Sequence, residues 1–111
     1  MIACQQEKHD RCEDDTNSLL SIEDSMEVNP QFARKKIDDG MKNASDSLTY
    51  YDYMSRLGKL FVLSSSPDSM PQYINPVVEF AEHQPESPRR NSLLAYAYNC
   101  QAGNYHNFHK K

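Results

Sequence analysis

Apolar residues in the middle of the chain recur at intervals of three and four. Met54, Leu57 and Phe61 occupy positions i, i+3 and i+7, which lie on one face of an α-helix. After a loop rich in serine, a second series follows at helical spacing, formed by Met70, Ile74, Val77 and Ala81. The loop offers an Asp or a Ser as N-cap of the second helix. The pattern predicts a helical hairpin over residues 47–82.

The segments on either side of this hairpin are also predicted to be helical. Asn29-Pro30 begins a helix, and another helix is expected before it, with Asp15 or Thr16 as its N-cap. Pro88 begins a final segment rich in apolar residues. The run of residues 60–63 could be a buried strand, but its place after a helical pattern favours the end of a helix. The sequence predicts an all-α fold of about five helices.

The segment Met54-Ser-Arg-Leu57-Gly58-Lys-Leu-Phe61 resembles the first helix of a tetratricopeptide (TPR) unit. That pattern has a large apolar residue, a Leu-Gly pair three and four positions later, and an aromatic residue one turn further on. Gly58 lacks a side chain where a neighbouring helix approaches closely, at a cost of about 1 kcal/mol in helix propensity.

The resemblance implies antiparallel helix hairpins, stacked as a short TPR-like right-handed array over residues 15–111. Ala102-Gly103 can be matched to the Leu-Gly pair of a further unit. Residues 46–51, 67–69 and 92–99 are also similar to the TPR sensor regions of some bacterial regulators. This similarity implies a protein-interaction or sensory scaffold that forms part of a larger signalling protein.

Charge is distributed unevenly along the chain. The 111 residues carry a net charge of −4, and residues 1–27 hold eight acidic and two basic side chains. Residues 1–14 are therefore predicted to be a flexible acidic arm. An ordered calcium loop is missing from this arm. The overall negative charge argues against nucleic-acid binding, which requires a basic face.

Cys4 follows a small residue near the start of the chain, as in the cleavage site of a bacterial lipoprotein. The chain as given lacks the basic and apolar regions of an export signal. If Cys4 is lipidated, we expect a periplasmic or membrane-anchored protein. Otherwise we expect a cytoplasmic one.

A zinc site is the alternative function. Cys100, His106 and His109 have a spacing that could bind zinc, with His83 as a fourth ligand. Zinc sites usually contain tighter paired motifs, so we interpret Cys100 as a buried thiol and expect no cofactor.

The motifs of common catalytic sites are absent from the sequence, and a non-enzyme is expected. In a TPR-like array the first helix of each hairpin lines a groove that binds a protein or peptide. Five residues are predicted to line it: Asp52, Tyr53, Arg56, Lys59 and Asn99. The competing interpretation places them on plain surface or in a contact with the next hairpin.

Two further expectations concern partners. The acidic surface could serve a small inhibitor or immunity-type protein that binds a basic partner. The last helix lacks a following helix in the sequence, so we expect an exposed apolar end and either self-association or a missing C-terminal continuation.

Overall fold

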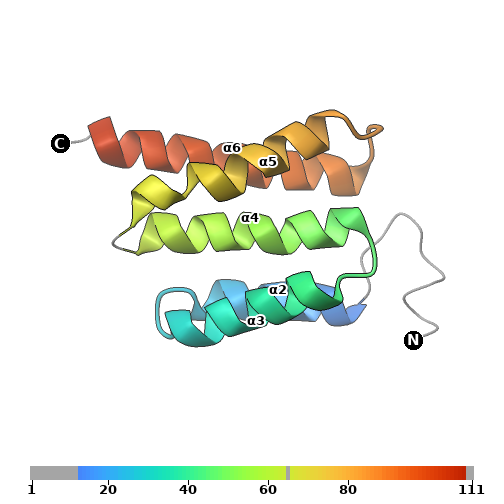
Figure 1. Cartoon of the computed structure of the whole chain (residues 1–111), viewed down its shortest axis with the longest axis horizontal. Helices are drawn as coiled ribbons and strands as arrows, with labels where there is room; N and C mark the ends of the chain where they lie inside the picture. Colours follow the sequence, from blue (N-terminus) through green and yellow to red (C-terminus); the bar gives the residue numbers. More distant parts are fainter. Residues whose placement is uncertain (1–12, 65, 110–111) are drawn as a thin grey trace.

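The computed structural model describes the backbone of residues 13–64 and 66–109 and the side chains of these residues up to Gly103. This part of the chain contains helices and connecting turns only, which confirms the predicted all-α fold (Figure 1). The elements are α2 (Glu13–Ser25), α3 (Pro30–Asn43), α4 (Ser47–Leu63), the short 3-10 helix η1 (Pro67–Ser69), α5 (Pro71–Glu82) and α6 (Pro88–His109).

Side-chain caps explain where α3 and α4 begin. Asn29 Oδ1 accepts a hydrogen bond from the backbone N–H of Phe32 at 3.2 Å. Asp46 Oδ1 accepts one from the N–H of Thr49 at 2.8 Å. Each cap satisfies an amide that has no partner inside its own helix. The predicted start of α3 at Asn29-Pro30 is confirmed.

The start of α2 differs from the prediction. The helix already includes Glu13, so Asp15 and Thr16 lie within its first two turns and neither is the N-cap. Three acidic residues in the first turn interact favourably with the positive end of the helix dipole, which explains why helix begins this early. Residues 1–12 of the predicted arm, with Cys4, lie outside the described residues.

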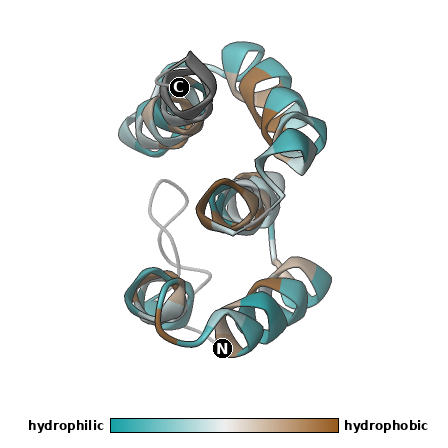
Figure 2. Ribbon diagram, turned by 90° about the vertical axis from the view of Figure 1, so that its left-hand side faces the viewer, coloured by the Kyte–Doolittle hydropathy of each residue, from teal (hydrophilic) through white to brown (hydrophobic). Residues whose placement is uncertain are grey.

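α4 lies at the centre of the molecule, with α2 and α3 on one side and α5 and α6 on the other (Figures 1 and 2). Two apolar clusters result. The first consists of Leu19, Ile22, Met26, Ala33, Ile37, Tyr53, Leu57 and Leu60. The second consists of Met70, Ile74, Val77, Ala81, Leu93, Ala97 and Cys100. This packing order agrees with antiparallel hairpins stacked in the order of the sequence.

The central position of α4 divides the apolar stripe that was expected on one face. Leu57 belongs to the first cluster and Phe61 packs against it, whereas Met54 packs against the second cluster. A helix between two layers buries side chains in more than one direction, so a single stripe does not describe it. Residues 60–63 form the last turn of α4, which confirms the helical interpretation of this run.

Gly58 allows α4 and α5 to approach closely, as predicted. A Cβ atom at this position would lie 2.4 Å from Cγ1 of Ile74, which no ordinary contact permits. Gly103, the other glycine of the TPR comparison, differs. A Cβ atom there would meet no atom within 4 Å, so no close helix contact requires this glycine.

The last helix is not left unpaired in its described part. α6 packs along both α5 and α4, and its buried residues Leu93, Ala97 and Cys100 belong to the second cluster. This packing covers one face of α6, whereas Tyr98 on the same helix is 44% exposed, so the exposed apolar end stays a prediction. None of the described helices is long and apolar enough to cross a membrane.

Candidate functional site

α2 and α6 lie on the same side of α4 (Figure 2). Side chains of the three helices meet there. The carboxylate of Glu23, on α2, lies 3.3 Å from Nε of Arg56 and 3.2 Å from Nζ of Lys59, both on α4. Tyr96, on α6, donates its hydroxyl hydrogen to Glu23. Its ring centroid lies 4.0 Å from the guanidinium carbon of Arg56. We call these four residues the three-helix cluster.

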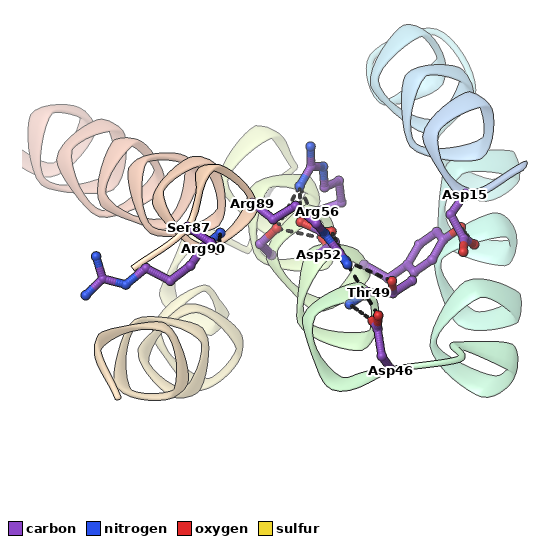
Figure 3. Close-up of polar contacts among 10 residues, drawn as sticks. Asp15, Asp46, Thr49, Asp52, Arg56, Ser87, Arg89 and Arg90 are labelled. Atoms are coloured by element: carbon purple, nitrogen blue, oxygen red, sulfur yellow. Dashed lines mark hydrogen bonds and ion pairs between the residues drawn. The ribbon is translucent and has the colours of Figure 1, made fainter. Parts of the chain in front are cut away.

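A second polar group joins the start of α6 to α4, and Figure 3 shows its members. Arg89 donates hydrogen bonds from Nη2 to Thr49 Oγ1 at 3.0 Å and from Nη1 to Asp46 Oδ2 at 3.3 Å. Its Nη2 also lies 3.7 Å from Oδ2 of Asp52, whose Oδ1 lies 3.6 Å from Nη1 of Arg56. Arg89 is 8% exposed and Asp52 is 3% exposed. Buried charges require such partners, so the pairing favours one position of α6 along α4.

Asp46 combines the N-cap of α4 with the ion pair to Arg89. Burial alone would raise the pKa of its carboxyl group. Hydrogen bonds from the Thr49 side chain and amide and from Arg89 outweigh burial, and the positive charge of Arg89 adds to them. The net result is a pKa below the usual value.

Two of the five residues predicted to line a groove do not lie on an open surface. Asp52 is buried in the group around Arg89, and Tyr53 is 1% exposed. The hydroxyl of Tyr53 donates a hydrogen bond to Asp15 at 2.7 Å. The ring fills the space left by Gly40, because a Cβ atom there would lie 2.3 Å from Cε1 of Tyr53. Both residues are covered because α4 has helices on both sides.

The other three predicted residues lie closer to solvent. The side chain of Arg56 is 12% exposed and that of Lys59 is 39% exposed. Asn99, on α6, is exposed. Lys59 and Asn99 border one cavity of about 290 Å³, which we call the α4–α6 cavity. Its lining residues are Lys59, Val62, Leu63, Tyr96, Asn99, Cys100 and Gly103. The structure thus brings together two of the predicted residues that are 40 positions apart in the sequence.

The Cys100 thiol is buried, as expected. Burial raises the pKa of this thiol to about 11, although the positive charges of Lys59 and Arg56 oppose the shift. His83 is exposed, with Nδ1 2.8 Å from the Glu79 carbonyl oxygen. The side chains of His106 and His109 lie outside the described residues. Among the side chains that are described, no three His, Cys, Asp or Glu residues are grouped as a metal site would require.

The sequence analysis missed three residues that hold this region together, namely Glu23, Arg89 and Tyr96. Glu23 looks like one more charge of an acidic helix, and Tyr96 like one of several tyrosines. The hydrogen bond between them joins positions 73 residues apart, and no local pattern indicates such a pairing. One signal was available for Arg89, because a basic residue is unfavourable in the first turn of a helix unless it has an acidic partner.

Comparison with known proteins gives no relative from which a function could be taken. No family model, no curated protein and no solved structure matches the chain.

Proposed function

We propose that this chain is a non-catalytic scaffold of TPR-like hairpins that binds a protein or peptide partner and serves a larger bacterial signalling protein. The binding surface would be the side formed by α2, α4 and α6, which we call the α2–α4–α6 face. The observation that carries the proposal is the three-helix cluster, in which side chains of all three helices meet. In stacked helical repeats the equivalent helices of successive units line one extended surface, which suits an elongated partner.

The polar stripe of α4 supports this choice of face. Thr49, Asp52, Arg56 and Lys59 follow at positions i, i+3, i+7 and i+10, so they lie on one side of the helix. Burial decreases along this stripe, from Thr49 at 1% exposed to Lys59, whose side chain is 39% exposed. We assign the buried members to holding the helices in register. Lys59, with Asn99 of α6, would contact the partner.

Photo-crosslinking from defined positions tests the proposal. A photoreactive phenylalanine analogue replaces either Asn99, on the proposed face, or Gln72, which is exposed on α5. We expect a specific protein to be captured from position 99 and not from position 72. Equal capture from both positions would contradict the choice of face.

The captured partner then allows a quantitative test with matched charge reversals. Lys59→Glu should weaken binding of the partner at least about tenfold. The variant loses the ammonium donor of Lys59, and its new carboxylate would repel the group of the partner that Lys59 would contact. Lys35→Glu, on the exposed side of α3, should change the dissociation constant less than about twofold. If the two variants bind equally well, the α2–α4–α6 face is not the binding surface.

A further inference from the structure

The α4–α6 cavity has a mostly apolar wall and a polar rim on one side. Val62, Leu63 and Cys100 supply apolar surface, and Leu63 is 43% exposed at the edge. Gly103 leaves its part of the wall open, since a Cβ atom there would meet nothing within 4 Å. Lys59 and Asn99 supply the polar side. Such a combination of apolar walls and a few polar groups is typical of sites for small molecules.

The rim carries unused hydrogen-bond donors. An ammonium group has three N–H donors, and within the described residues Glu23 is the only carboxylate paired with Lys59. The Asn99 side chain forms no hydrogen bond with any described residue, so its amide is also available. Both residues can therefore donate to an additional acceptor inside the cavity.

Charge around the cavity favours an anion. Among the described residues that line this cavity, Lys59 carries a charge and none is a carboxylate, because Glu23, the partner of Lys59, lies outside the lining. The ammonium group of Lys59 therefore borders the cavity without a carboxylate beside it in the described lining. The larger groove beside α3, of about 540 Å³, differs in this respect. There Arg34 and Lys35 are each paired with an aspartate one helical turn away, so no charge is left over.

We propose that the α4–α6 cavity binds a small carboxylic acid with an apolar body. The carboxylate would accept hydrogen bonds from Lys59 and Asn99, and the apolar part would lie against Val62 and Tyr96. A volume of about 290 Å³ is at the lower limit of ligand sites, which points to a ligand of about ten to fifteen non-hydrogen atoms. This inference does not depend on the scaffold function, because the cavity would bind such an acid without any protein partner.

Titration of the full 111-residue chain with 4-phenylbutanoate tests the proposal. The backbone amide signals of residues 59, 99 and 103 are followed by ¹H–¹⁵N NMR. We expect saturable shifts with a dissociation constant of about 1 mM, which is typical of a ligand this small. The neutral analogue 4-phenylbutanamide should bind at least about tenfold more weakly, because it lacks the charge that Lys59 recognises.

Two variants test whether the ligand binds in the α4–α6 cavity, and each has a matched control. Gly103→Leu fills open space and improves helix propensity, so the fold is kept and binding should fall at least about tenfold. Ala102→Leu, an exposed neighbour outside the lining, should leave binding unchanged. Lys59→Met should reduce acid binding to the level of the amide, and Glu23 keeps Arg56 as its partner in this variant. Lys35→Met on α3 is its control.

Several results would overturn the proposal. These are the absence of saturable shifts, equal affinity for the acid and the amide, and unchanged binding by Gly103→Leu or Lys59→Met in a folded protein. Tighter binding of an acetylated peptide that ends in phenylalanine would replace the free acid by a peptide terminus as the ligand.

Discussion

On the side of α4 that faces α2 and α3, Leu57, Leu60 and the ring of Tyr53 enter a cluster made of apolar groups. On the side that faces the start of α6, Asp52 is buried between two arginines, and Thr49 accepts a hydrogen bond from Arg89. α4 therefore contacts α3 through apolar groups and the first turn of α6 through charged and polar groups. Apolar burial supplies most of the free energy of folding but is non-directional, so several helix positions satisfy it almost equally.

The ion pairs on the other side have the opposite character. Removing two charges from water costs nearly as much as their attraction returns, so a buried pair adds little net stability. The directions of its hydrogen bonds nevertheless penalise any shift of α6 along α4. We infer that the α3 side mainly stabilises α4 and that the α6 side mainly selects the register of the last helix.

The largest effect is expected from a cavity on the apolar side. Ile37 of α3 has no exposed surface and packs in the first cluster. Ile37→Ala should lower the free energy of unfolding by about 3 kcal/mol, measured by urea denaturation, because it loses buried apolar groups and leaves a void. Leu20→Ala is the control, since Leu20 is 60% exposed and its truncation should cost less than about 0.5 kcal/mol. Similar losses in both variants would show that Ile37 is not a core residue.

Local patterns allowed much of this fold to be predicted. Helical spacing gave the hairpin over residues 47–82, and the capping residue Asn29 gave the start of α3, because both depend on neighbours within a few positions. The same holds for Gly58, whose missing side chain fits a close helix contact. The Asp or Ser expected as N-cap of the second helix was wrong, since Asp68 and Ser69 lie in η1 and α5 begins after Met70 without a side-chain cap. The spacing could not show how many sides of α4 are covered. This is why Asp52 and Tyr53, predicted on a groove, are buried.

The candidate site could be predicted only in part. Arg56 and Lys59 were identified because they share a helix face, which spacing reveals. Their partner Glu23 lies on another helix, and the contact of Tyr96 with Glu23 depends on the stacking of all three helices. Such contacts require the tertiary structure.

A smaller effect is expected when the polar side loses one member. Arg89→Met should lower the free energy of unfolding by about 2 kcal/mol, because Asp52 stays buried and loses one of its positively charged partners. Adding Asp52→Leu should recover part of this loss, since the double variant buries one charge fewer and places an apolar side chain there. Urea denaturation of the wild type, both single variants and the double variant gives the coupling energy.

The control for this comparison is Arg34→Met. Arg34 forms an exposed pair with Asp38, in which both side chains are about half exposed, so its loss should change stability by less than about 0.5 kcal/mol. Strictly additive effects of Arg89→Met and Asp52→Leu would show that the two residues do not interact, and the proposed register function of the α6 side would be lost.

The smallest effect is expected at Asp46, and its pH dependence separates the charge of this residue from its function as N-cap. Asp46→Asn keeps an N-cap acceptor for α4 but removes the charge that pairs with Arg89. The folded-state pKa of Asp46 lies below the usual 3.8, so its contribution is complete above that pH and disappears as the pH falls through the folded-state value. Because the Asp46 side chain is 49% exposed, we expect Asp46→Asn to cost less than about 1 kcal/mol near neutral pH. The two proteins should become equally stable once the pH is low enough to neutralise the wild-type carboxyl in the folded state. A difference in stability that persists at low pH would assign the loss to the cap and not to the charge.

The control is Asp38→Asn, which removes a charge from an exposed pair and should show less than half of this effect at neutral pH.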